Sequence, residues 1–143
     1  EMCIRDRKMT ISFKVIGQPQ SKARPRFANG HIYTPKGTKV YEADVKKAYL
    51  AVAQGYYFKD GPVSLVITAY LKRAKSNRRK FATTKPDIDN ILKAVLDGLN
   101  GVAFDDDKQV VNISAHKLYC NNADDIPYII VKLDNFNFKE ESK

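Results

Sequence analysis

Residues 85–101 read KPDIDNILKAVLDGLNG, and the rest of the chain is organised around this segment. Apolar side chains recur in it at the spacing of one helix face, namely Ile88, Ile91, Leu92, Val95, Leu96 and Leu99. Asp87 is a favourable N-cap after Pro86, and Gly101 is a typical helix stop. We therefore expect an amphipathic helix that begins with two carboxylates, Asp87 and Asp89, and carries the Lys93 ammonium one turn later.

Two interpretations of these carboxylates are open. In the structural one, Asp87 caps the helix while Asp89 complements the helix dipole and pairs with Lys93. Against it, Asp97 lies near the helix C-terminus, where the dipole disfavours an anion, and residues 105–107 are three adjacent acids that repel one another without a cation. Carboxylates without His or Cys ligands select Mg²⁺ or Mn²⁺ rather than zinc. We favour a metal site.

The composition indicates one domain with polyanionic partners. The chain has 143 residues, 25 Lys and Arg against 16 Asp and Glu, and a formal net charge of +9. No apolar run approaches the roughly 18 residues that a membrane span needs, so no membrane partner is expected. Two cysteines, Cys3 and Cys120, predict a reduced, cytoplasmic protein without disulfides.

The remaining pattern predicts an α+β fold. We expect a single mixed β-sheet with two helices packed on one face, in the order β-α-β-α-β-β. The expected strands are residues 11–16, 63–71, 110–119 and 128–133, the last two paired as a hairpin, and the first helix is residues 38–54 with Thr38 as N-cap and an apolar face that includes Val40 and Val52. Because the strand pattern starts at Met9, we expect residues 1–8 to be a non-native leader, residues 9–134 a single domain and residues 135–143 a polar tail.

Two basic segments flank the predicted elements. Residues 18–37 form a long loop, with a short strand at residues 31–34, in which Lys22, Arg24 and Arg26 alternate with aromatics. Such a loop suits phosphate contacts and base stacking, although a solvated surface loop is the alternative. The second segment joins a strand to the acidic helix and has seven positive charges and no negative one: Lys72, Arg73, Lys75, Arg78, Arg79, Lys80 and Lys85. We expect it to bind phosphates rather than act as a solvated loop.

At these residues the chain resembles the RusA family of Holliday-junction resolvases, common in phages and prophages. The resemblance covers residues 9–133 and is carried by D-I-D-N at residues 87–90 with Lys93 and Asp97, D-D-K-Q-V at residues 106–110, S-K-A-R-P-R-F at residues 21–27 and Y-T-P at residues 33–35. The extra Asp105 is a departure from the family pattern. It leaves open whether Asp106 or Asp107 is the third metal ligand, and we favour Asp107 because it precedes Lys108-Gln109.

The resemblance implies a Mg²⁺-dependent homodimeric endodeoxyribonuclease. Such an enzyme binds four-way branched DNA, the Holliday junction, by its structure and nicks two opposed strands symmetrically in recombination and repair. By the same resemblance Asp87, Asp89 and Asp107 are the catalytic, metal-binding acids and Lys93 is the catalytic lysine.

The chemistry of these residues agrees with phosphodiester hydrolysis. Carboxylate-bound Mg²⁺, for which Mn²⁺ could substitute, suits phosphodiester hydrolysis, and an ammonium can orient water or stabilise negative charge. Asn90, Asp97 and Asp106 are candidates to orient Lys93 or a metal-bound water. The alternatives are a non-catalytic, structure-selective nucleic-acid-binding protein and a Mg²⁺ nuclease for other branched DNA.

Overall fold

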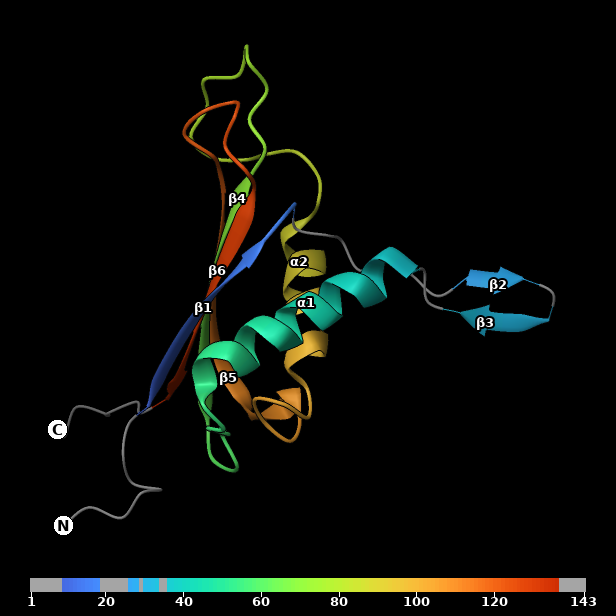
Figure 1. Cartoon of the computed structure of the whole chain (residues 1–143), viewed down its shortest axis with the longest axis vertical. Coiled ribbons are helices and arrows are strands. Elements are labelled where there is room, and N and C mark those ends of the chain that lie inside the picture. Colours follow the sequence, from blue (N-terminus) through green and yellow to red (C-terminus); the bar gives the residue numbers. More distant parts are fainter. Residues whose placement is uncertain (1–8, 19–25, 29, 34–35, 137–143) are drawn as a thin grey trace, which may run out of the picture.

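The sheet and its two helices have the predicted arrangement. The structure is a computed structural model. It describes residues 9–18, 26–28, 30–33 and 36–136. Four strands form one mixed sheet in the spatial order β1 (Thr10–Ile16), β6 (Tyr128–Asn135), β4 (Val63–Leu71), β5 (Val110–Tyr119). The helices α1 (Lys36–Ala53) and α2 (Ile88–Leu99) lie on the same face of this sheet (Figure 1). The expected α+β class and element order are confirmed.

Two short strands stand apart from the main sheet. β2 (Arg26–Ala28) and β3 (His31–Tyr33) pair with each other as an antiparallel hairpin within the first basic segment (Figure 1). Only β3 has a counterpart in the sequence prediction. A single turn of 3₁₀ helix, η2 (Asp107–Gln109), precedes β5.

Alternation along the central strands places the core between sheet and helices. Every second residue of β4 is buried, from Val63 to Leu71, because successive strand residues point to opposite faces. The side chains of Val45 and Tyr49 on α1 and of Val95 and Leu99 on α2 close this core and are fully buried. No helix within the described ranges is both long enough and apolar enough to cross a lipid bilayer, and Cys120 is a buried free thiol.

The strand β6 departs from the prediction. The expected hairpin between β5 and β6 is wrong, because β6 is inserted between β1 and β4 and is antiparallel to both. Its Ile129, Val131 and Leu133 side chains are completely buried, and the central position gives β6 neighbours on both edges. Hydrophobicity predicted the strand itself, but it contained no information about which strand lies beside it.

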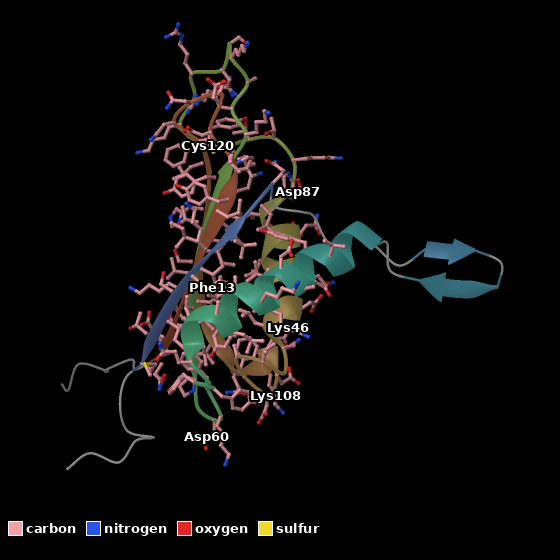
Figure 2. All side chains as sticks on the ribbon, viewed as in Figure 1. Phe13, Lys46, Asp60, Asp87, Lys108 and Cys120 are labelled. Atoms are coloured by element: carbon pink, nitrogen blue, oxygen red, sulfur yellow. The ribbon has the colours of Figure 1, made fainter. Side chains whose placement is uncertain are left out.

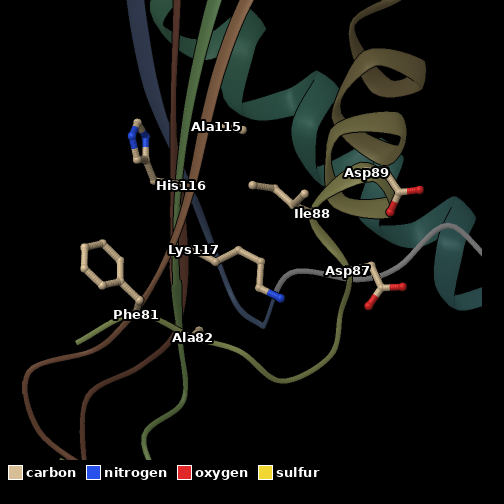
Figure 3. A pocket seen from close by; sticks show the side chains of 8 residues that line it. All are labelled: Phe81, Ala82, Asp87, Ile88, Asp89, Ala115, His116 and Lys117. Atoms are coloured by element: carbon tan, nitrogen blue, oxygen red, sulfur yellow. The ribbon is translucent and has the colours of Figure 1, made fainter. Parts of the chain in front are cut away.

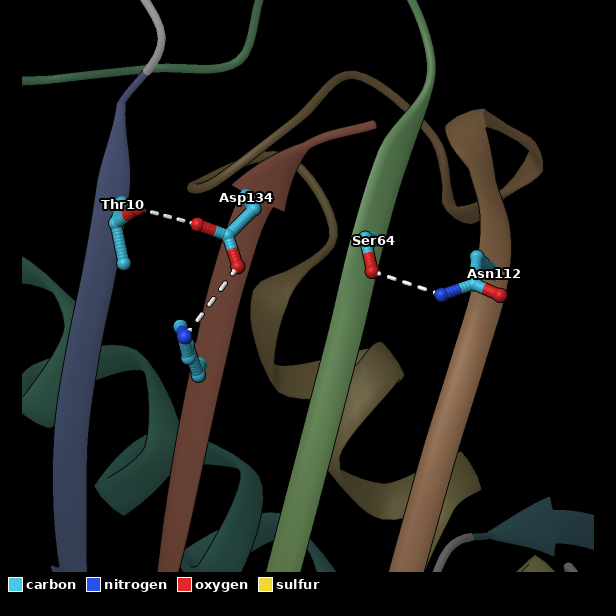
Figure 4. A network of polar contacts seen from close by, with 5 residues as sticks. Thr10, Ser64, Asn112 and Asp134 are labelled. Carbon is cyan, nitrogen blue, oxygen red and sulfur yellow. Dashed lines mark hydrogen bonds and ion pairs between the residues drawn. The ribbon is translucent and has the colours of Figure 1, made fainter. Parts of the chain in front are cut away.

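β6 also continues two residues beyond its predicted end at Leu133. Asp134 accepts a hydrogen bond from the Thr10 hydroxyl and lies 4.0 Å from the Lys132 ammonium (Figure 4). Asn135, which we expected to begin the polar tail, pairs with Val63. The polar side chains of Lys132 and Asp134 fit here because they lie on the face of the sheet opposite the helices, where Asn112 Nδ2 also donates to Ser64 Oγ over 3.0 Å.

The first helix begins two residues earlier than predicted. α1 starts at Lys36, so Thr38 lies within the helix and is not its N-cap. Val40 and Val52, assigned to the buried face, are 52% and 47% exposed. The buried face is instead centred on Val45, because this is where α1 crosses α2.

The crossing of the two helices depends on Gly98. A Cβ atom at this position would lie 2.8 Å from Val45 Cβ and 2.9 Å from the Glu42 carbonyl oxygen. Side-chain atoms do not approach this closely, so the absence of a side chain sets the separation of α1 and α2. Gly98 therefore fixes the position of α2 against the core.

We predict that Gly98→Ala destabilises the protein by roughly 1–3 kcal/mol, as overpacked core positions do. Alanine favours a helix over glycine by about 1 kcal/mol, so a purely local effect would have the opposite sign. Urea unfolding followed by circular dichroism measures the difference. A variant as stable as the parent would show that the helices separate without cost.

Candidate active site

Asp87 and Asp89 lie at the beginning of α2. Asp87 occupies the cap position, where its backbone carbonyl accepts from the amides of Asn90 and Ile91, but its side chain makes no capping hydrogen bond. Both carboxylates are exposed, and among the described residues no ion pair joins Asp89 to Lys93. The cap and the intrahelical ion pair of the structural interpretation are therefore not found here, although Asp89 Oδ1 accepts a hydrogen bond from the Asn90 backbone amide over 2.9 Å.

These two acids border a hollow between α2 and β5. The hollow has a volume of about 570 Å³, and its walls include Asp87, Asp89 and Ala115 (Figure 3). Ile88, predicted as part of the apolar core stripe, lines the same hollow and is 42% exposed. The deeply buried residues of the helix include Ala94 and Gly98 instead, which moves the core face toward α1.

Lys117 also lines this hollow, and sequence reasoning did not assign it to the site. Its ammonium donates to the Thr84 carbonyl oxygen over 2.6 Å and points from β5 toward Asp87 (Figure 3). In the sequence Lys117 only continues the alternation of a strand. Only the pairing of the strands reveals that its side chain lies on the helix-covered face, because β5 pairs in parallel with β4 and Lys117 lies opposite the buried Ala69.

At the far end of α2 the three consecutive acids have different surroundings. Asp105 accepts from the Tyr57 hydroxyl, and its own amide donates to Gln109 Oε1 over 3.0 Å. Asp106 Oδ1 accepts from the Lys108 amide over 3.1 Å and so caps η2. Asp107 lies beside Asp97 and the Asn100 side chain.

The acids predicted to converge are thus held at opposite ends of one helix. α2 has 12 residues, which at about 1.5 Å per residue separates its ends by roughly 18 Å. Figure 2 shows Asp87 and Lys108, the neighbour of Asp107, at these two ends. In the part of the chain that the structure describes, no three potential metal ligands form one group. A single chain does not bring Asp107 to Asp87 and Asp89.

Topology explains this separation. Parallel strands need a crossover connection, and α2 is the crossover between β4 and β5. The helix therefore starts where the strands end and finishes where β5 begins. Asn90 and the exposed Lys93 lie in the first half of α2, whereas Asp97 lies in the second half.

The second basic segment lies at the same end of the molecule as Asp87. Its backbone extends beyond the end of β4 and then returns to the start of α2 (Figure 1). Six of its seven basic side chains are exposed: Lys72, Lys75, Arg78, Arg79, Lys80 and Lys85. Arg78 lines two further hollows of about 520 and 440 Å³.

Arg73 differs from the other bases of this segment. Its Nε donates to the Cys120 carbonyl and its Nη1 to the Asn77 carbonyl, each over 2.7 Å. The guanidinium thus ties the segment to the connection after β5, which is a structural role. Of the bases predicted in the first segment, Lys22 and Arg24 lie outside the described residues, as does the side chain of Arg26.

Comparison with known proteins identifies the family. The family described as "Endodeoxyribonuclease RusA" matches residues 17–133, most of the chain. The chain belongs to the RusA family. It is also 33% identical over 129 residues to "Uncharacterized protein YqaN" of Bacillus subtilis (strain 168), an alignment that covers 76% of this chain and 87% of that protein. As a RusA-family member the chain is a DNA-binding endonuclease, and its basic end carries the exposed acids Asp87 and Asp89.

The neighbouring carboxyls of Asp106 and Asp107 influence each other. The Lys108 amide and a hydrogen bond with Asp107 lower the pKa of Asp106. The hydrogen bond with Asp106 raises the pKa of Asp107, and desolvation and the nearby Asp106 and Asp97 charges act in the same direction. Asp107 therefore takes up a proton before Asp106 as the pH falls.

We predict that Asp106→Asn lowers the pKa of Asp107 toward its ordinary value, because the main cause of the upward shift is removed. Carbon-13 NMR titration of the side-chain carboxyls in metal-free buffer measures this change. Asp124→Asn, in the turn at the other end of the sheet, serves as the control and leaves Asp107 unchanged. An unaltered Asp107 midpoint in Asp106→Asn would contradict the assignment.

Proposed function

We propose that this RusA-family protein is a Mg²⁺-dependent, homodimeric endonuclease that resolves Holliday junctions in recombination and repair, with residues 9–134 as its catalytic domain. The observation that carries the proposal is the pair of exposed carboxylates at the start of α2. The Asp87 side chain makes no capping hydrogen bond, and both acids border a hollow and lie at the basic end of the molecule. Branched DNA would meet metal ligands and phosphate-binding side chains at one place.

The donor set fits a hard cation. Mg²⁺ is commonly held by one or two carboxylates together with substrate phosphate and water, and Asp87 and Asp89 supply two such carboxylates. The ion, or Mn²⁺ in its place, would activate a water molecule and offset negative charge on the phosphate. Both acids lie at the N-terminal end of the α2 dipole, where negative charge is stabilised.

Lys93 is proposed to act beside this pair. It is exposed on α2, one helical turn beyond Asp89, and an ammonium there can stabilise the negative charge that develops during hydrolysis. Asn90 lies between them in sequence, and its backbone amide donates to Asp89 Oδ1 over 2.9 Å. We propose that Asn90 thereby orients the Asp89 carboxylate.

The third acid is proposed to come from a second copy of the chain. Because α2 separates Asp107 from Asp87 within one chain, Asp107 could join the pair only across a dimer interface. A two-fold dimer also supplies two equivalent sites for two opposed DNA strands. The edge strand β5 offers a surface for this contact, since its Val111 and Ile113 side chains are about half exposed. Asp97 and Asp106 would then orient Asp107 from its own chain.

We predict that Asp89→Asn abolishes Mg²⁺-dependent nicking of a synthetic four-way junction while leaving its affinity for the junction in Ca²⁺ within about threefold. Loss of a metal-binding carboxylate removes the chemistry, whereas the basic segment still binds DNA. Gel analysis of cleavage products and fluorescence anisotropy give the two readings. Asp44→Asn, an exposed acid of α1, is the matched control. Persistent cleavage in Asp89→Asn would refute the catalytic assignment.

We further predict that mixing inactive Asp89→Asn with inactive Asp107→Asn chains restores cleavage, because half of the sites in mixed dimers combine an intact Asp87–Asp89 pair with an intact Asp107. The mixture is refolded together and its nicking rate is compared with that of each variant alone. If each site lies within one chain, every site in the mixture carries a mutation and no activity returns.

A further inference from the structure

Lys117 occupies a position that the proposed nuclease chemistry leaves unexplained. It comes from β5, on the sheet face that the helices cover, and it lines the same hollow as Asp87 and Asp89 (Figure 3). Among the described residues that line this hollow it is the only permanently charged cation. Its neighbour Ala115 is small and leaves room above the strand.

The Lys117 side chain is fixed in place. The Thr84 carbonyl oxygen accepts a hydrogen bond from the Lys117 ammonium over 2.6 Å. The segment that carries Thr84 is itself paired to β5, because the Ala82 amide donates to the Lys117 carbonyl and the Tyr119 amide donates to the Lys80 carbonyl, each over 3.0 Å. The ammonium is therefore preorganised rather than freely rotating.

Tethering leaves donors available for a ligand. An ammonium has three N–H bonds, and the Thr84 carbonyl is the one acceptor that the described part of the chain provides. The hollow that Lys117 lines has a volume of about 570 Å³, within the range of ligand-binding clefts. A phosphate oxygen is a suitable acceptor, since hydrogen bonds between charged partners are short and strong.

The charges around the hollow also require another cation. With Lys93 and the Asp107 of a second copy included, three carboxylates, one Mg²⁺ and one ammonium sum to zero, so a DNA phosphodiester brought to this site adds one uncompensated negative charge. Lys93 lies on the exposed side of α2, and Lys117 lies inside the hollow. A fixed ammonium there can neutralise the phosphate without any rearrangement of the chain.

We propose that Lys117 is a phosphate-binding residue of the active site, which holds the DNA phosphodiester against the Asp87–Asp89 pair. This inference rests on the proposed function, because it assumes that DNA is cut at these two acids. Thr84 is the positioning partner, since its carbonyl directs the ammonium into the hollow.

The test compares Lys117→Met and Lys117→Arg with the parent on a synthetic four-way junction. Methionine keeps most of the side-chain volume and removes the charge. We expect Lys117→Met to lower kcat/KM about tenfold or more and to reduce the slope of log affinity against log salt by about one, as the loss of one phosphate contact does. Lys117→Arg keeps the charge and the donors, so both quantities stay within about threefold of the parent.

Two controls separate binding from structural support. Lys46→Met removes an exposed charge on α1 and leaves both quantities unchanged. Tyr119→Phe loosens the same segment, because it removes the 3.2 Å contact between the Tyr119 hydroxyl and Thr84 Oγ1, yet it keeps the charge and leaves the salt slope unchanged. Melting temperatures of all variants are recorded alongside.

Lys117→Met with the salt slope of Lys46→Met would overturn the inference. So would a Lys117→Arg variant that is as impaired as Lys117→Met and melts at the same lowered temperature, because the role would then be structural. Binding is measured in Ca²⁺, so the slope tests Lys117 independently of cleavage. Failure of the proposed function gives a different result, namely a parent protein without cleavage or an Asp89→Asn variant that retains it.

Discussion

The parallel pairing of β4 with β5 is the constraint on which the rest of this molecule depends. Parallel neighbours cannot be joined by a tight turn, so the chain must return along the length of the sheet, and α2 makes that return. Its position against the core is set by the contact of Gly98 with Val45. The direction of α2 then places Asp87 and Asp89 beside the ends of the strands and Asp107 beside the start of β5.

Sequence periodicity predicted those elements whose burial is decided locally. The bounds of α2 and β4 follow from apolar spacing, because each has one face against the core. The neighbours of β6 could not be found in this way, since the fully buried Ile129 and Val131 fit a strand in any central position. The site shows the same division: the Asp87–Asp89 pair is a local motif, whereas Lys117 joins it only through the register of β5 with β4.

Hydrogen bonding distinguishes acids that look alike in the sequence. Asp105 and Asp106 both make contacts that hold the turn before β5, one with Tyr57 and the other with the Lys108 amide. Asp107 lies beside Asp97 and Asn100 instead. The same distinction separates Arg73, whose guanidinium is bound to two carbonyl oxygens, from the exposed bases that follow it.

The basic and the acidic side chains at this end of the molecule have complementary roles in the proposed function. On the proposed function, the basic side chains at one end of the sheet would attract the DNA backbone, and a metal ion held by the nearby acids would be needed to cut it. Carboxylates alone would repel phosphate, and they become useful only where cations surround them. The segment that links β4 to α2 satisfies both conditions, because it carries the bases, ends at Asp87, and is fastened to β5 where Lys117 bonds to Thr84. On the proposed function, binding of the phosphate and its position over the acids would therefore both depend on one continuous stretch of chain and the strand to which it is tied.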